Sequence, residues 1–301
     1  MEARIGELAA LLTAVCWTAT AIAFEAASRK VGSVPVNIIR LVMALVLISL
    51  FSWFRRGMFL PMDATVFNWQ WLALSGLIGF VVGDLFLFKA FTVIGSRLTL
   101  LVMTLVPPVA AFAGWLMLGE RLALIHLFAM LLTIAGIAMV IVQKRQKKSQ
   151  QENVLESVSP LGLFYALMGT IGQGTGLVLS KYGMGDYDAI SANQIRVMAG
   201  IVGFTIVVHF FRKWLAVNKA LKNTKALKII LIGAVLGPFA GVSLSLIAVK
   251  HTAAGIASTL MSISPILILP ATYFLYKHKV SSWEMLGAII SICGVTLFFL
   301  W

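Results

Sequence analysis

Long apolar stretches without charged residues constrain this fold more than any other feature. A helix needs about 20 mostly apolar residues to cross a bilayer. Eight stretches lack Asp, Glu, Lys and Arg: 8–24, 64–83, 98–119, 122–142, 157–180, 229–249, 251–276 and 285–301. Two more, 31–54 and 189–211, are each interrupted by one arginine, Arg40 and Arg196. Lipid-exposed backbone must satisfy its own hydrogen bonds, so we predict an all-α integral membrane protein with ten transmembrane helices.

The composition excludes a soluble protein. Charged residues make up 12% of the chain, about half the fraction in globular proteins. The net charge of +13 comes from basic residues between apolar blocks, which favours anionic phospholipids as partners and not nucleic acid. Near span ends we count 6 basic residues on the side of the N-terminus and 15 on the other. We therefore expect a bacterial inner-membrane protein with both termini outside.

The chain repeats itself. A displacement of 156 residues aligns Asn37 with Asn193 and Arg40 with Arg196, and after a two-residue change in a loop a displacement of 158 aligns later positions, namely Gly79 with Gly237, Gly83 with Gly241 and Pro107 with Pro265. We divide the chain into a first repeat (1–143), a polar linker (144–157) and a second repeat (158–301). Each repeat holds five predicted spans, and an odd number inverts the second copy in the membrane, an arrangement typical of secondary transporters. An inert duplicated bundle is the alternative.

Several short motifs resemble those of one family. They are Gly83-Asp84-Leu-Phe-Leu-Phe-Lys-Ala90, Leu105-Val-Pro-Pro108, Leu118-Gly-Glu-Arg121 and Gly136. The chain resembles the EamA family of the drug/metabolite transporter superfamily over essentially its whole length. The resemblance implies two five-helix units that export or exchange small polar metabolites such as amino acids. Tyr276-Lys-His-Lys279 replaces Leu-Gly-Glu-Arg in the second unit, so we expect no symmetric role for Glu120.

Two arginines at mid-span are candidate substrate ligands. An ionisable side chain at mid-membrane costs roughly 2.5 to 3.5 kcal/mol on insertion scales and is by default a functional candidate. Asn37 and Asn193 precede Arg40 and Arg196 by three residues, so each pair shares a helix face. We predict that all four line a cavity and that the guanidinium groups bind a carboxylate or phosphate. The alternative is a structural hydrogen bond to a carbonyl freed at a kink.

Three further residues complete the predicted site. Asp84 is the only acid deep in a span; it either couples transport to protons or pairs with Arg40 or Arg196. Trp17 lies midway through its span, where a cavity wall suits it better than an interfacial belt. Gln173 is the polar residue that corresponds to Trp17 in the second repeat, and glycines flank it. Alternatively, these glycines permit close helix packing.

Prolines within spans are predicted hinges: Pro107, Pro108, Pro238 and Pro265. Proline removes a backbone donor and bends a helix.

No nucleotide-binding loop, hydrolase motif or metal-spaced Cys/His cluster occurs in the sequence. We therefore expect no enzyme activity, no cofactor and no metal, and transport driven by a gradient. The favoured function is a secondary active transporter, an exporter or exchanger of a small polar metabolite, acting as a monomer or homodimer. The alternative is a flippase for a lipid or lipid headgroup, because an arginine-lined cavity also suits a headgroup.

Overall fold

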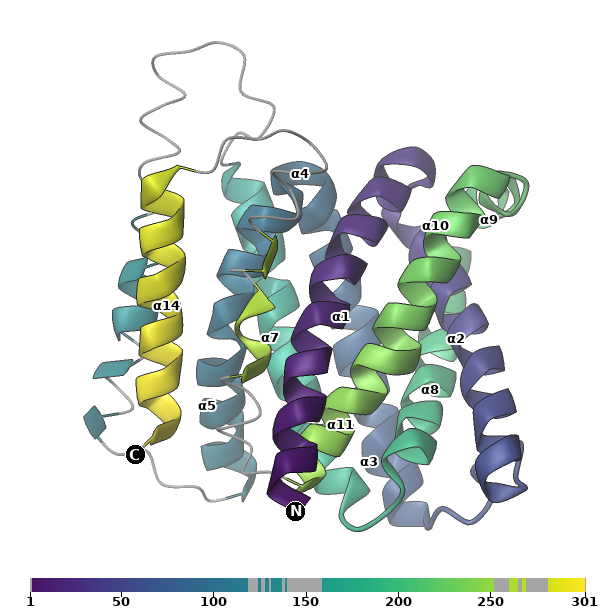
Figure 1. Cartoon of the computed structure of the whole chain (residues 1–301). Coiled ribbons are helices and arrows are strands. Elements are labelled where there is room, and N and C mark those ends of the chain that lie inside the picture. Colours follow the sequence, from purple (N-terminus) through teal and green to yellow (C-terminus); the bar gives the residue numbers. More distant parts are fainter. Residues whose placement is uncertain are drawn as a thin grey trace.

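The computed structural model describes residues 2–118, 159–251 and 281–300, with the short pieces 124–125, 128–129, 131–136, 139, 260–264 and 267–268 between them. All regular elements in this part of the chain are helices (Figure 1). Six are long and apolar enough to cross a membrane: Ile5–Val31, Ser33–Arg56, Val66–Met117, Pro160–Met184, Ala189–Phe210 and Thr224–His251. The predicted all-helical class is therefore observed. The count of ten stays a prediction, because the predicted spans 122–142 and 251–276 lie largely outside the described residues.

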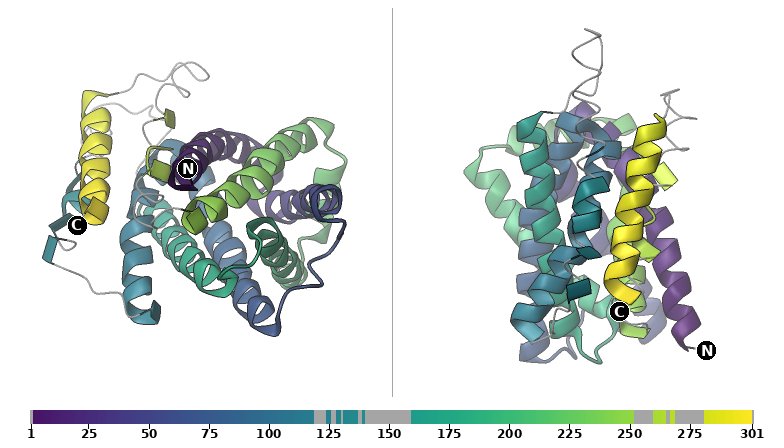
Figure 2. Two further views of the ribbon diagram at one scale, coloured as in Figure 1. Left: turned by 60° about the horizontal axis from the view of Figure 1, so that its bottom comes forward. Right: turned by 90° about the vertical axis from the view of Figure 1, so that its left-hand side faces the viewer.

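The helices of the first half follow one another as α1 (Glu2–Val31), α2 (Ser33–Arg56), α3 (Val66–Gly76), η1 (Leu77–Gly83), α4 (Asp84–Val102), η2 (Met103–Leu105) and α5 (Val106–Leu118). Those of the second half are α7 (Pro160–Met184), α8 (Ala189–Phe210), α9 (Trp214–Leu221), α10 (Thr224–Ala234), η3 (Val235–Gly241), α11 (Val242–His251) and α14 (Ser282–Leu300). Both chain ends lie at the same end of the bundle, the terminal face, and α9 lies at the other, the α9 face (Figure 1). Viewed toward the terminal face, helices of the two halves lie next to one another, and α14 lies at the edge of the bundle (Figure 2).

Polar side chains set the starts of several helices. Thr65 accepts a hydrogen bond from the Asn68 amide, and the Asn68 side chain accepts one from the Thr65 amide, which forms a capping box at α3. Asp188 accepts the Ser191 amide at 2.9 Å and caps α8. These caps satisfy amides that have no partner within the helix.

The third predicted span, 64–83, is too short. The apolar helical segment from Val66 to Met117 has 52 residues, about 78 Å at 1.5 Å per residue, which is more than twice the hydrocarbon thickness. It is divided at Gly95, whose φ of 77° and ψ of 162° are not helical. Beyond this turn the Ser96 amide donates to Glu25 Oε2 at 2.8 Å. The charge-free run stops before Asp84, but the helix continues past this buried residue to the turn.

Two π-helices occupy equivalent positions in the repeats. The segments η1 and η3 each have seven residues and start 158 positions apart, at Leu77 and Val235. This spacing equals the displacement that aligns the later parts of the repeats in the sequence. Single π-turns within α-helices are rare and occur frequently at functional sites.

Each π-helix packs against the first helix of the other half. A Cβ atom added to Gly176 of α7 would lie 2.9 Å from Gly79 Cα in η1, so only glycine permits this approach. At the equivalent contact in the other repeat, a Cβ atom added to Gly237 of η3 would lie 2.9 Å from Thr20 Cγ2 of α1. The two halves are thus interlocked around the middle of the bundle.

Candidate functional site

A cavity of about 150 Å³ lies between the two halves. Its walls are mainly apolar and include Trp17, Phe24, Phe80, Leu87, Phe88, Phe91, Leu100, Met103, Leu177 and Met261. The polar lining consists of the predicted residues Arg40, Asp84, Gln173 and Arg196, together with Thr20, Thr104, Ser245, Ser262 and Ser264. Lining residues come from both repeats, so movement of one half against the other would change its shape.

Arg40 and Asp84 form a buried ion pair in the cavity wall. Their residues are each 4% exposed. Arg40 Nε donates to Asn37 Oδ1 at 3.0 Å, and Gln173 Nε2 donates to Asp84 Oδ1 at 2.6 Å. Four predicted site residues from α2, α4 and α7 therefore form one network, and charge-assisted bonds of this kind are the strong ones. In the structure Asp84 is paired with Arg40, as one of the two alternatives predicted. A role of Asp84 in proton coupling stays a prediction.

Arg196 has a different environment from its counterpart. It is 4% exposed and its guanidinium carbon lies 5.0 Å from the centre of the Phe80 ring. Asn193 donates instead to the Pro238 carbonyl at 2.7 Å and to Ser243 Oγ at 3.1 Å. Within the described part of the chain, Arg196 Nε and Asn193 Oδ1 have no hydrogen-bond partner. The equivalence predicted for the two Asn/Arg pairs therefore does not extend to their contacts.

Both asparagines lie behind the cavity wall. Asn37 and Asn193 are fully buried and contribute no surface to the cavity, unlike Arg40 and Arg196. Asn37 Nδ2 donates to the Ser33 carbonyl at 3.1 Å. In this structure the asparagines hold backbone and side-chain groups in place, whereas we had expected them to face a substrate.

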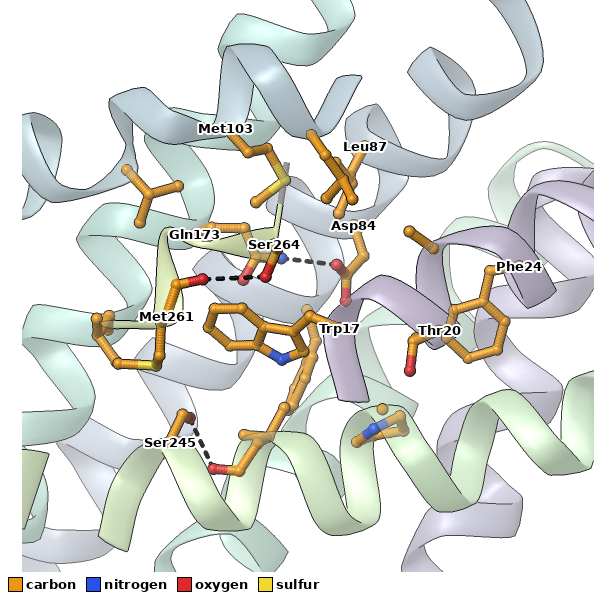
Figure 3. A pocket seen from close by; sticks show the side chains of 18 of the residues that line it. Trp17, Thr20, Phe24, Asp84, Leu87, Met103, Gln173, Ser245, Met261 and Ser264 are labelled. Atoms are coloured by element: carbon orange, nitrogen blue, oxygen red, sulfur yellow. Dashed lines mark hydrogen bonds between the residues drawn. The ribbon is translucent and has the colours of Figure 1, made fainter. Parts of the chain in front are cut away.

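Trp17 and Gln173 face the cavity from equivalent positions, 156 residues apart, on α1 and α7. Figure 3 shows Trp17 in the centre of the pocket and the hydrogen bond between Gln173 and Asp84. Gln173 Nε2 also donates to the Gly79 carbonyl in η1 at 3.3 Å. Trp17 packs against η3, because a Cβ atom on Gly241 would lie 3.2 Å from the indole nitrogen.

Comparison with known proteins identifies the family. The profile of the EamA-like transporter family matches residues 4–142 and 160–300, which together make up most of the chain. The chain belongs to the EamA-like transporter family. This confirms the resemblance, and the protein is an integral membrane protein of a transporter family. The family is not a family of enzymes. The two matched segments also support the internal repeat.

A solved crystal structure has the same fold. It shares 14% sequence identity with this EamA-like chain, and the TM-score is 0.64 over 98% of this chain and 96% of the other. At this identity the similarity establishes the fold alone. A search of curated protein sequences found no match.

Two of the predicted hinge prolines of this EamA-like protein, Pro107 and Pro238, line the cavity. Pro107 and Pro108 fall in the first turn of α5 and are buried, and Pro107 lines the cavity. Since Pro107 has no amide hydrogen, the Val106 amide bonds to the Met103 carbonyl instead, which tightens the helix into the 3₁₀ turn η2. Pro238 lies inside η3 and lines the cavity. Pro265 lies outside the described residues, and the hinge role of all four prolines stays a prediction.

The phenylalanines of the lining are not among the predicted site residues. The Phe80 ring lies beside both guanidinium groups, 5.8 Å from that of Arg40 and 5.0 Å from that of Arg196. Arg40 also lies 4.7 Å from the centre of the Phe88 ring. Cation–π contacts stabilise a desolvated arginine. In the sequence these phenylalanines cannot be distinguished from those that face lipid, because both kinds occur in continuous apolar runs.

A second polar group joins the halves at the terminal face. Arg55 pairs with Asp188, and Arg56 pairs with Asp63 and lies 3.9 Å from Asp188. Tyr187 Oη donates to Asp63 Oδ1 at 2.8 Å. We call these five residues the terminal-face cluster. It connects the end of α2 and the following loop to the turn before α8, which belongs to the other repeat.

Ionisation of the cluster follows from its contacts. Burial acts to raise the pKa of Asp188, but hydrogen bonds from Arg55 and Ser191 outweigh it and hold that pKa below its usual range. Burial likewise opposes the shift at Asp63, where bonds from Tyr187 and Arg56 lower the pKa. The two carboxylates are therefore ionised at neutral pH. In the opposite direction, burial and the bond to Asp63 raise the pKa of Tyr187.

Proposed function

We propose that this protein is a secondary active transporter, an exporter or exchanger of a small polar metabolite such as an amino acid. Transport would proceed by alternating access between two inverted five-helix repeats, with ten transmembrane helices in a bacterial inner membrane. The observation that carries the proposal is the cavity between the halves, which contains three buried ionisable residues, Arg40, Asp84 and Arg196. Such residues are costly in a membrane interior and mark substrate or ion pathways.

The size of the cavity supports a small substrate. A cavity of about 150 Å³ suits a small metabolite better than a larger solute.

The symmetry supports the alternating mechanism. The π-helices η1 and η3 lie at equivalent positions beside the cavity, and each is crossed by the first helix of the other half. Exchange of conformation between two such halves would move an opening from one face to the other at similar energy.

Flux through purified protein tests this function. The protein is reconstituted in liposomes, and counterflow of radiolabelled metabolites is measured for a panel that includes amino acids. The cavity variant is Thr20→Phe, which places a ring in the lining; the control is Val46→Phe on the outer surface of α2, where Val46 is 52% exposed. We expect counterflow that the cavity variant abolishes and the control retains. If no solute exchanges while a fluorescent phospholipid changes leaflet, the protein is a flippase and the proposal is wrong.

A further inference from the structure

The buried charges in the cavity do not balance. Among the described lining residues, Arg40 and Arg196 carry positive charges and Asp84 carries the negative one. One positive charge is therefore left without a counter-ion. The site is buried, because each of these three residues is only 4% exposed. A buried charge is costly unless it is paired. A bound monoanion would supply the missing charge.

Arg40 is not available to such an anion. Its Nε is bonded to Asn37, and one of its two terminal nitrogens, Nη2, is bonded to Asp84. The rings of Phe24 and Phe88 lie 5.3 Å and 4.7 Å from its guanidinium carbon. The two acceptors and the neighbouring rings fix this group within its own half.

Arg196 is available. Its Nε has no hydrogen-bond partner within the described residues, and no carboxylate among them forms an ion pair with it. The Asn193 side chain, which would correspond to the partner of Arg40, is bonded to Pro238 and Ser243. A guanidinium fork that lies beside Phe80, with no hydrogen bond or ion pair to the described residues, suits two parallel bonds to a carboxylate.

The remaining walls indicate what accompanies the carboxylate. Leu87, Phe91, Leu100 and Met103 line the cavity and offer apolar contact, whereas hydroxyl groups such as that of Thr20 add polar contacts to a lining that is mainly apolar. A zwitterion carries no net charge, so it would leave the excess positive charge of this buried site unbalanced. The charge balance thus selects monoanions over zwitterions.

We propose that the substrate is a small monocarboxylate with an apolar chain and no amino group, and that Arg196 binds its carboxylate. This inference rests on the proposed transport function. It keeps a small metabolite as the substrate but replaces the amino acid, given there as an example, with a carboxylate that has no amino group.

Three ligands with one carbon skeleton test the inference: 4-methylpentanoate, leucine and 4-methylpentanamide. Their binding to the full chain in nanodiscs is measured by calorimetry. We expect 4-methylpentanoate to bind at least about tenfold more tightly than the other two, the effect of one charge-assisted contact. Equal or tighter binding of leucine would overturn the assignment.

Variants of Arg196 locate the contact. Arg196→Gln should weaken binding of 4-methylpentanoate about tenfold and leave the amide unchanged, and Arg196→Lys should restore part of the loss. A merely structural arginine would instead weaken all three ligands equally, which would refute the proposal. Transport is scored separately: counterflow of leucine without 4-methylpentanoate overturns the substrate class alone, whereas binding without any flux overturns the transport function.

Discussion

Arg40 and Arg196 occupy equivalent positions in the two repeats, yet only Arg40 is paired with a buried carboxylate. The difference arises one residue after each π-helix, where the first repeat has Asp84 and the second has Val242. One substituted position therefore gives a symmetric scaffold an asymmetric distribution of charge.

Asp84→Asn should destabilise the protein. It leaves Arg40 buried without its counter-ion, a change that costs about 3 to 5 kcal/mol when one partner of a buried pair is removed. The double variant Arg40→Gln/Asp84→Asn should recover much of that loss. Thermal unfolding of both purified variants measures the effect. A single variant as stable as the unmodified protein would show that the ion pair contributes little.

Asp84→Asn also tests proton coupling. Loss of coupling would leave downhill counterflow running while a pH gradient no longer affects flux. Both fluxes are measured on the same folded preparation, so that a lower yield of protein is not read as a lower rate. Unchanged pH-driven flux would remove Asp84 from the coupling mechanism.

Gly176→Ala should weaken the contact between α7 and η1. The new methyl group would lie 2.9 Å from Gly79 Cα, and overpacking of this kind costs about 1 to 3 kcal/mol. Ile171→Ala on the same helix is the matched control, since Ile171 is 47% exposed. Chemical denaturation in mild detergent measures both. A larger loss for Ile171→Ala would contradict the packing described here.

The terminal-face cluster should respond to acid. Folding lowers the pKa of Asp63 and Asp188, so the unfolded chain binds protons more readily than the folded protein. The stabilisation is then fully present above the ordinary carboxylate pKa of about 4 and is lost as the pH falls through the lower folded values.

Asp188→Asn isolates the charge in this cluster, because asparagine is also a good helix N-cap. We expect it to cost about 1 kcal/mol or less at neutral pH, as partly exposed ion pairs do, and to flatten the acid limb of stability. Asp188→Ala removes the cap as well and should cost about 1 kcal/mol more. Melting temperatures from pH 3 to pH 8 provide the comparison, and an unchanged acid limb in Asp188→Asn would refute the assignment.

Cysteine labelling tests the orientation. The excess of basic residues predicts that residues 144–152 of the linker lie in the cytoplasm. In a variant without the native cysteines, Ser149→Cys should escape an impermeant reagent in intact cells and react after permeabilisation. Met62→Cys, in the loop at the terminal face where Met62 is 79% exposed, should react in intact cells. The reverse pattern would invert the orientation.

The sequence predicted the helical class, the family and the residues of the cavity network better than it predicted the contacts. The apolar runs and the repeat displacement of 156 to 158 residues can be read directly from the order of residues, so they can be recognised without a structure. The turn at Gly95 was missed because a charge count treats Asp84 as a boundary, although a paired carboxylate does not interrupt a helix. The bond between Gln173 and Asp84 depends on α7 approaching α4, which no local pattern encodes.

The terminal-face cluster also affects the relative populations of the two access states of the protein. At the position of Asp188 the first repeat has Gly32, and no described ion pair joins the two halves at the α9 face. Two identical repeats would make the two access states equally populated, but ion pairs worth a few tenths to 1 kcal/mol each shift that ratio severalfold. Solute arriving from the α9 face would therefore meet a receptive protein more often than solute from the terminal face, and the apparent affinities on the two sides of the membrane would differ by the same factor.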